Sequence, residues 1–451
     1  MNASAKRSLP QLKLTRHRLV LLSTLAIGLV LFVWQLGSTG LVDETPPLFA
    51  ASARAMAETG DWLIPRVNGL PRYDKPPLVY WLMGALYALP GQQAWNPLGT
   101  WAARLPSALA SVALMLGLAH TLLRWPQRSR APGATALAAA LAYGLSPLAL
   151  VWGRISVSDA LLAGCLGLSL LLSWRCYAAG GRRWWQAWLV LGLAVLAKGP
   201  VAVVLLGFTL LLFGWLQADL GGLWARLRPL PGLALTALVA LPWYGLALLV
   251  EGEPFWQSFF GYHNLQRFTA VVNNHQAPWW FFGPVLVIAS LPVTPLLLLG
   301  LAQGLGRLRE PLAPELSLQR FAACWLLAVL LFFTAAATKL PSYWLPATPA
   351  AGLLVALAAQ RGGRWAWGLS LLLTALLTGG LAAGPLWLPL IESPEMPTLV
   401  AELLGAPWVP LAAAFWALAL LLGAWVGWRK DALSGLLALQ LPLAAFVPVV
   451  L

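Results

Sequence analysis

The chain has 451 residues, of which 60% are hydrophobic and only 10% are charged, and its mean hydropathy is +0.75. Apolar runs recur from one end to the other, which excludes a water-soluble globular protein and predicts a polytopic membrane protein. The formal net charge is +14, but the basic residues are concentrated in loops of one set, so the charge indicates topology and nucleic acid is not an expected partner.

An all-α fold follows from the need to satisfy every backbone hydrogen bond in hydrocarbon, since the apolar runs are too long and uniform for barrel strands. We predict a transmembrane helical bundle of about 13 spans, some near the usual ~20 residues and some shorter. In chain order the expected spans are Leu19–Leu36, Trp101–Leu123, Gly133–Trp152, Val157–Ser173, Trp184–Ala197, Val201–Leu216, Gly232–Val250, Trp279–Leu301, Phe321–Thr338, Tyr343–Ala359, Trp365–Leu390, Val409–Trp428 and Ala432–Leu451.

The distribution of charge predicts the orientation of this bundle. On this map 20 of the 29 Lys and Arg residues fall in one set of loops, and 11 of the 15 acidic residues fall on the opposite side. Because basic loops are retained in the cytoplasm, we expect a cytoplasmic N-terminus, with residues 1–18 forming a basic tail. The first apolar run is interpreted as an uncleaved anchor, and the protein as an integral plasma or inner membrane protein.

The first external loop, residues 41–100, is far longer than a connector needs to be. Thr45 followed by Pro46 is typical of a helix start, and Leu48, Ala51 and Ala55 then recur at helical spacing. The later apolar stretch PPLVYWLMGALYALPG is too short to cross a ~30 Å core. We therefore expect both pieces to be helices lying at the external interface.

The remaining external polar residues stand at the ends of spans, in short motifs. Asp159 follows Arg154 by five residues at the start of one span, and we expect these two to pair at its mouth. The other motifs contain Lys198, His263 with Arg267, and Lys339 with Tyr343. Ionisable groups at membrane depth cost roughly 2.5–3.5 kcal/mol each, so they tend to line functional cavities.

The ordered set of these motifs resembles a known superfamily. After an acidic pair come GDWLIPRVNGLPRYDKPPLVYWL, RISVSD, KGPVA, HNLQRF and KLPSYWLPATPA, an order similar to that of the aminoarabinose transferases and protein O-mannosyltransferases, which are family 39-like glycosyltransferases of the GT-C fold. The resemblance implies a bundle near 13 spans, a lipid-linked sugar donor and an active site on the face away from the cytoplasm. Two departures are that Thr45-Pro46-Pro47 follows the acidic pair and that Asp74 stands where the relatives have Glu.

The resemblance covers residues 19–390, which we interpret as the GT-C-like transmembrane catalytic domain. Residues 391–451 are expected to form a C-terminal loop and further transmembrane helices. A polyprenyl-phosphate-linked donor, a lipid, glycan or protein acceptor, and membrane lipids are the partners that this reading implies.

Transfer from such a donor needs a base that accepts the proton of the acceptor hydroxyl, a role worth about 10²–10⁴-fold in rate. Asp43 is the first candidate and Glu44 the second, the alternative being that both favour the positive end of the helix that begins near Pro46. Asp159 is a further candidate for a catalytic carboxylate or for orienting the acceptor, with an N-terminal helix charge as its alternative.

The leaving phosphate needs cations, and losing one such group often costs about 10²–10³ in rate. Lys75 is the leading candidate because Pro76 and Pro77 restrain the backbone beside it. The supporting candidates are Lys198, Arg267, Lys339 and Tyr343, with snorkelling at the interface as the alternative for the lysines.

Asp74 and His263 together could hold a divalent metal, but two ligands from distant loops are a weak signal, and solvated residues at the interface are the favoured explanation. No other cofactor is predicted. Two rivals to the transferase of lipids or glycans remain: a protein O-mannosyltransferase and, from another class, a lipid-linked sugar flippase, which would need polar groups at the bilayer midplane and internal repeats.

Overall fold

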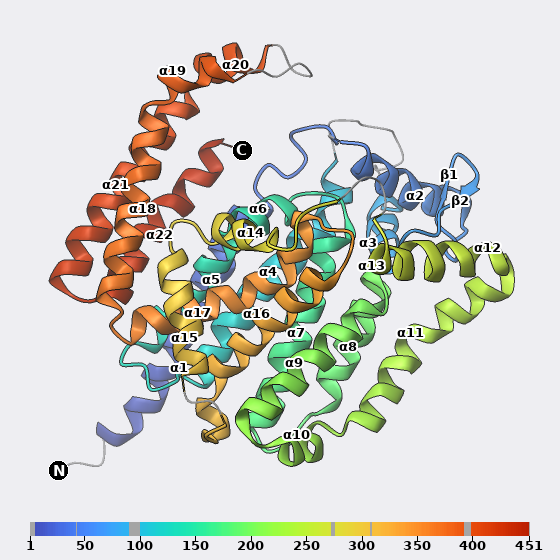
Figure 1. Cartoon of the computed structure of the whole chain (residues 1–451), viewed down its shortest axis with the longest axis horizontal. Helices are drawn as coiled ribbons and strands as arrows, with labels where there is room; N and C mark the ends of the chain where they lie inside the picture. The colour runs from blue at the N-terminus through green and yellow to red at the C-terminus, as the bar shows by residue number, and fades with distance from the viewer. Residues whose placement is uncertain are drawn as a thin grey trace.

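The structure is a computed structural model that describes residues 5–41, 43–89, 100–271, 276–306, 309–391 and 398–450. Positions 90–99 of the expected first external loop and 392–397 of the expected C-terminal loop lie outside these ranges. Within the described residues the chain is a helical bundle whose only sheet is a hairpin of two strands with two residues each, and Figure 1 shows the helices side by side.

The first half of the chain contains the elements α1 (Ala5–Phe32), α2 (Thr45–Thr59), β1 (Arg66–Val67), β2 (Leu70–Pro71), α3 (Leu78–Tyr87), α4 (Trp101–Arg124), α5 (Pro132–Gly144), α6 (Pro147–Trp152), α7 (Ser158–Ala178), α8 (Trp185–Lys198), α9 (Val201–Gln217), α10 (Leu220–Leu227) and α11 (Pro229–Glu251). The second half contains α12 (Glu253–Phe255), the π-helix η1 (Trp256–Gln266), α13 (Arg267–Thr269), α14 (Phe282–Ala289), α15 (Thr294–Leu305), η2 (Pro314–Leu316), α16 (Leu318–Ala335), η3 (Pro341–Ala347), α17 (Thr348–Gln360), α18 (Arg364–Ala382), α19 (Gly384–Trp387), η4 (Leu388–Leu390), α20 (Leu399–Gly405), α21 (Trp408–Arg429) and α22 (Ala432–Val450).

The helical membrane fold is confirmed, whereas the count of 13 spans is not. Among the described residues nine helices are long and apolar enough to cross a membrane, or ten if α14 and α15, bent by 112°, count as one span. The difference has a physical cause: the expected spans at α8 and α9 are only 14 and 17 residues long, and the expected span Gly133–Trp152 is broken between α5 and α6 before Pro147.

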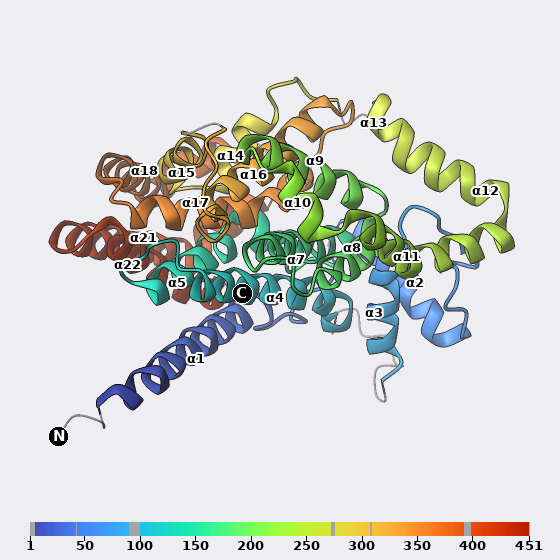
Figure 2. The ribbon, with the colours of Figure 1, turned by 90° about the horizontal axis from the view of Figure 1, so that it is seen from below.

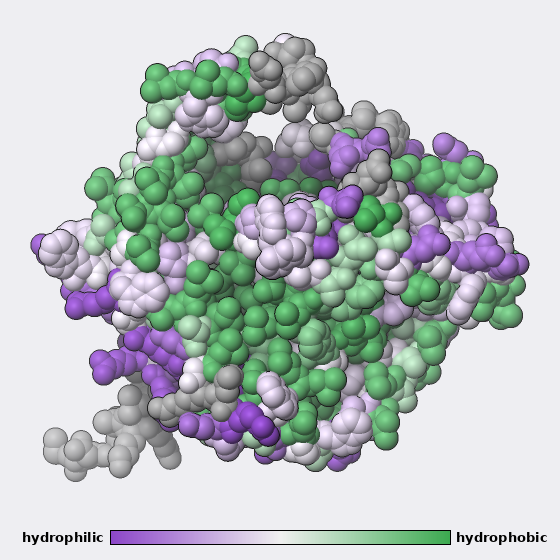
Figure 3. Space-filling view, in the orientation of Figure 1, coloured by the Kyte–Doolittle hydropathy of each residue, from purple (hydrophilic) through white to green (hydrophobic). Residues whose placement is uncertain are grey.

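The core of the bundle is formed by helices that are buried on nearly every side. The segment Pro341–Gln360 is 94% buried, whereas α21 is only 17% buried. Small residues allow close approach there, since a Cβ added at Gly352 would come within 2.8 Å of the Ala139 carbonyl oxygen. Figure 3 shows the complementary exterior, a broad hydrophobic band across this face with hydrophilic residues above and below it, as expected for a surface that faces lipid.

Both expected helices of the first external loop are present. α2 begins at Thr45, with Pro46 and Pro47 as its second and third residues, and α3 begins after the buried Pro77. They gather with β1 and β2 at the upper end in Figure 1, and the arm α12–η1–α13 projects from one edge of the bundle in both ribbon views (Figures 1 and 2). Their position at the membrane interface stays a prediction.

Candidate functional site

One cavity of about 1280 Å³ gathers nine of the ten residues singled out in the sequence. It lies where the N-terminal ends of α2, α3 and α7 meet the C-terminal end of α8, the arm and η3. Those nine residues are Asp43, Glu44, Asp74, Lys75, Asp159, Lys198, His263, Arg267 and Tyr343. Segments more than 250 residues apart in sequence therefore meet at one end of the bundle.

A second, mainly apolar compartment of about 390 Å³ adjoins this cavity. Its apolar lining comes from the arm, α7, α9, α16 and the residues around η3, and it consists of Leu162, Pro200, Val201, Val204, Phe260, Leu265, Phe268, Phe332, Phe333, Ala336 and Pro346. Lys75, Arg267 and Tyr343 are among the residues that line both spaces. The two compartments thus form one amphipathic cavity, charged on one side and apolar on the other.

Lys75 stands at the boundary of the two compartments, on the bend before α3. Its Nζ donates to the Asp74 carbonyl at 2.8 Å and lies 3.9 Å from Asp74 Oδ2. Burial, with the charges of Lys198 and Arg267, lowers the pKa of Lys75 to about 8 even though Asp74 opposes the shift. The ammonium is therefore charged at pH 7, and Asp74 neutralises it only weakly. Such a cation is suited to binding an anion.

Asp74 is committed to Arg72. The Arg72 guanidinium donates to both carboxylate oxygens, at 2.7 and 2.8 Å, and lies 5.0 Å over the Phe49 ring. Burial raises the pKa of Asp74, but the charge of Lys75 and the bonds from Arg72 outweigh it and lower that pKa. Among the described residues no group of three or more His, Cys, Asp or Glu could hold a metal ion, so the two-ligand metal site stays a prediction.

Asp159 pairs with Lys198, so the prediction that it pairs with Arg154 is wrong. The distance from Lys198 Nζ to Asp159 Oδ1 is 2.6 Å, while the Arg154 guanidinium donates to the carbonyls of Leu31 and Trp34. Arg154 precedes the first turn of α7 and reaches back to the end of α1, whereas Asp159 enters the bundle on α7. Lys198 also lies 5.4 Å from the centre of the Tyr343 ring.

His263 and Arg267 are placed by the π-helix η1, a rare conformation that is frequent at functional sites. His263 Nδ1 and Arg267 Nε are buried without a hydrogen-bond partner among the described residues. Burial and the charge of Lys75 lower the pKa of His263 to about 4, so the ring is neutral at pH 7. The backbone N–H groups of Ala337 and Thr338 donate to the Phe268 and Arg267 carbonyls, which fasten the arm beside η3.

Lys339 is the one candidate that the structure does not bring to the cavity. Its side chain is only 9% exposed, and its Nζ donates to the Ala336 carbonyl at 2.6 Å. The motif that contains it does contribute Ser342 and Tyr343 to the lining. Sequence spacing alone could not distinguish which polar residue of this motif turns inward.

Asp43 and Glu44 lie exposed at the outer part of the charged compartment, just before α2. Asp43 has a positive φ of 77°, and its Oδ1 accepts a hydrogen bond from the Glu44 backbone N–H at 2.7 Å. Glu44 is the N-cap residue of α2, and its side chain makes no capping hydrogen bond to the first turn. No ion pair holds either carboxylate among the described residues, which leaves both accessible to a ligand.

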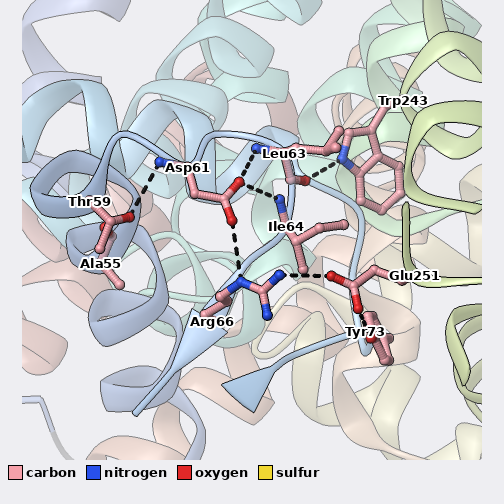
Figure 4. Close-up of polar contacts among 9 residues, drawn as sticks. All are labelled: Ala55, Thr59, Asp61, Leu63, Ile64, Arg66, Tyr73, Trp243 and Glu251. Carbon is pink, nitrogen blue, oxygen red and sulfur yellow. Dashed lines mark hydrogen bonds and ion pairs between the residues drawn. The ribbon is translucent and has the colours of Figure 1, made fainter. Parts of the chain in front are cut away.

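A network that the sequence did not reveal fixes the loop that carries Lys75 (Figure 4). Arg66 bridges Asp61 at 3.2 Å and Glu251, at the end of α11, at 2.8 Å. The Tyr73 hydroxyl donates to the other Glu251 oxygen at 2.5 Å, and Trp243 Nε1 donates to the Leu63 carbonyl at 2.8 Å. Partners some 180 positions apart leave no local pattern from which this network could have been found.

Comparison with solved structures defines the class of protein. The fold matches ArnT from Cupriavidus metallidurans bound to undecaprenyl phosphate, with a TM-score of 0.78 and 26% identity over 95% of this chain and 76% of that one. The archaeal oligosaccharyltransferase AglB from Archaeoglobus fulgidus shares the fold, with a TM-score of 0.52 and 15% identity over 89% and 56% of the two chains. The chain is thus a polytopic membrane protein of GT-C architecture.

Sequence comparison narrows the class. Residues 74–245 match the family model described as dolichyl-phosphate-mannose-protein mannosyltransferase. Undecaprenyl phosphate-alpha-4-amino-4-deoxy-L-arabinose arabinosyl transferase from Pseudomonas aeruginosa is 31% identical over 376 residues, 82% of this chain and 64% of that protein. The enzyme of the same name from Sodalis glossinidius, numbered 1 in that organism, is 33% identical over 70% of this chain and 54% of that protein. The chain is therefore similar to the aminoarabinose transferases and protein O-mannosyltransferases of the GT-C superfamily, and it spans less than two thirds of the length of these curated relatives.

Proposed function

We propose that the protein transfers a monosaccharide from a polyprenyl-phosphate carrier to a lipid or glycan acceptor on the extracytoplasmic face of the membrane. The observation that carries the proposal is the amphipathic cavity in which Lys75, Arg267 and Tyr343 line both the charged and the apolar compartment. A phosphate at this boundary meets two cations and a hydroxyl, and a prenyl chain attached to it enters the apolar compartment.

The donor phosphate is held by the Lys75 ammonium, the Arg267 guanidinium and the Tyr343 hydroxyl. Their interactions with the leaving phosphate become stronger as negative charge develops on it, because the cavity excludes much of the water. Lys198 and Asp159 neutralise one another, so we assign this pair to holding Tyr343 and the substrate in place. The neutral His263 adds no charge at pH 7.

Asp43 is the proposed base for a hydroxyl acceptor, with Glu44 beside it. The acceptor oxygen attacks the anomeric carbon and forms the new glycosidic bond, the bond from that carbon to the phosphate oxygen breaks, and its electron pair leaves with the polyprenyl phosphate. The acceptor proton passes to the Asp43 carboxylate. Direct attack inverts the anomeric centre.

The names of the related proteins direct the choice of donor. They name undecaprenyl phosphate-linked 4-amino-4-deoxy-L-arabinose, and the family model names dolichyl phosphate mannose with protein as acceptor. We therefore place the pentose donor first and polyprenyl-phosphate mannose second, with a lipid acceptor ahead of a protein acceptor because the longer alignments are with the arabinosyl transferases.

The test uses purified protein in detergent, each donor in turn, and an envelope lipid extract as acceptor. We expect consumption of donor and release of free polyprenyl phosphate, and much slower release with the Lys75→Ala variant. Detergent solution contains no membrane that separates two compartments. A flippase, which only moves the donor across a bilayer, therefore produces no chemical change in it. Intact donor in every combination, together with movement of donor across proteoliposomes by the same protein, would overturn the transferase assignment.

A further inference from the structure

A cavity of about 1070 Å³ lies at the end of the bundle opposite the charged compartment. It is enclosed by the connection between α4 and α5, the end of α15, the start of α16, the end of α17 and the start of α22. These are the ends at which the spans meet the basic loops. No residue of this cavity belongs to either compartment of the candidate site.

Three arginines of its lining, Arg128, Arg130 and Arg361, carry exposed side chains and form no ion pair within the described chain. Arg128 and Arg361 line the same cavity from different elements. Although Arg361 is exposed, partial desolvation of its guanidinium and the charge of Arg128 lower the pKa of Arg361. The lining contains one acid, Asp431, whose Oδ1 accepts the Ser434 backbone N–H at 2.7 Å at the start of α22.

The same cavity is lined by buried hydrogen-bond acceptors. Gln127 Nε2 donates to the Glu315 carbonyl and Gln319 Nε2 to the Gly300 carbonyl, at 2.6 and 2.9 Å. Their Oε1 atoms, and that of Gln360, are buried with no partner in the described part of the chain. Both Gln127 and Gln319 are only 3% exposed. A buried amide oxygen without a donor is costly, so these positions favour a ligand that brings hydroxyl groups.

We propose that this cavity binds the headgroup of an anionic glycerophospholipid of the phosphatidylglycerol type, from the membrane leaflet on the side of the basic loops. Arg128 and Arg361 receive the phosphate, and the glutamine oxygens accept the glycerol hydroxyls. Basic pockets between spans on the cytoplasmic side are a recurrent setting for such lipids. A zwitterionic ethanolamine headgroup fits less well, because its ammonium would lie among several arginines, with Asp431 as the one acid of the lining.

A lipid bound in this cavity also connects two parts of the bundle. Asp431 and Leu433 belong to the α21–α22 pair, whereas Arg128 and Arg361 follow α4 and α17 of the core. A headgroup in the cavity contacts both parts. It therefore fastens the sparsely buried α21 and its partner to the centre of the bundle.

The test is native mass spectrometry of the full chain in detergent, titrated with phosphatidylglycerol. We expect one retained lipid on the wild type, at least about tenfold weaker binding for the double variant Arg128→Gln/Arg361→Gln, and a rise in melting temperature with lipid that this variant lacks. The matched control is Arg182→Gln/Arg183→Gln, which removes the same charge at the same end but outside the cavity. Arg128 and Arg183 share a positive φ, of 60° and 57°, so backbone strain is matched as well.

Equal retention by wild type and the Arg128/Arg361 variant overturns the proposal, as does an equal loss in the control. Phosphatidylethanolamine binding as tightly as phosphatidylglycerol also overturns it, and so does inorganic phosphate raising the melting temperature as much as the lipid does. Size-exclusion profiles and lipid-free melting temperatures show whether each variant is folded. The further variant Gln127→Leu, which keeps the arginines, is expected to weaken binding without abolishing it.

Discussion

Lys198 Nζ lies 2.6 Å from Asp159 Oδ1, and the two side chains are only 15% and 14% exposed. The pair joins the C-terminal end of α8 to the first turn of α7, and Lys198 also lies 5.4 Å from the centre of the Tyr343 ring. Removing one partner leaves a buried charge without compensation, whereas removing both does not.

We therefore expect Lys198→Met to destabilise the protein by about 3 kcal/mol and to lower its melting temperature in detergent by several degrees. The double variant Lys198→Met/Asp159→Asn is expected to recover part of this loss. Thermal unfolding of the wild type, both single variants and the double variant measures the coupling. Strictly additive effects of the two substitutions would contradict the pairing.

Asp43→Asn is expected to reduce transfer to a hydroxyl acceptor at least about 100-fold, because it removes the proposed base from an exposed position where no ion pair with another described residue holds it. Turnover is measured at matched amounts of folded protein. Glu44→Gln is the matched control and is expected to have the smaller effect. Near-normal turnover of Asp43→Asn would contradict its role as the base and would leave it a structural role before α2.

Lys75→Ala is expected to raise the donor KM and to lower kcat, while Lys75→Arg preserves part of the activity, since the role is cationic but its geometry is tight. Lys339→Ala serves as the control at the same end of the bundle. Its ammonium is bound to the Ala336 carbonyl, so this substitution should affect thermal stability rather than the donor KM. If both Lys75 variants bind donor normally, the phosphate is held elsewhere.

The dependence of kcat/KM on pH also depends on the charge of the Lys75 ammonium. Because the pKa of Lys75 is lowered to about 8, the amine is charged below that pH and loses its proton, and its charge, as the pH rises through it. We expect kcat/KM for the donor to fall above about pH 8, by up to tenfold per unit. His263, with a pKa of about 4, does not titrate in this interval. An unchanged profile in Lys75→Arg would assign the fall to another group.

Orientation is tested by labelling introduced cysteines with an impermeant reagent in intact cells. Leu70→Cys is suited to this because Leu70 is 72% exposed at the β1–β2 turn, and we expect it to react from outside. Arg182→Cys, exposed at the opposite end, should react only after the inner side is opened. The native cysteines lie in α7 and α16 and supply the background. The reverse pattern inverts the topology.

Much of the fold could be predicted from the sequence, because burial in lipid leaves few choices for a backbone. Each expected span falls on a helix or on two or three consecutive helical pieces, and Thr45 is the first residue of α2, as its proline-rich start predicted. The number of crossings was harder to predict. A stretch such as α9, with 17 residues, is apolar both when it spans lipid and when it packs inside a bundle.

The sequence by itself determined the types of residue at the site and the end of the bundle at which they lie, because charged side chains in an apolar chain are tolerated chiefly at span ends and in cavities. Only the tertiary structure decided their partners. Asp159 meets Lys198 rather than Arg154, Lys339 turns to a carbonyl while its neighbour Tyr343 lines the cavity, and Arg66 reaches Glu251 across 185 positions. Ion pairs form between groups that packing brings within about 4 Å, and the packing of distant helices leaves no trace in local spacing.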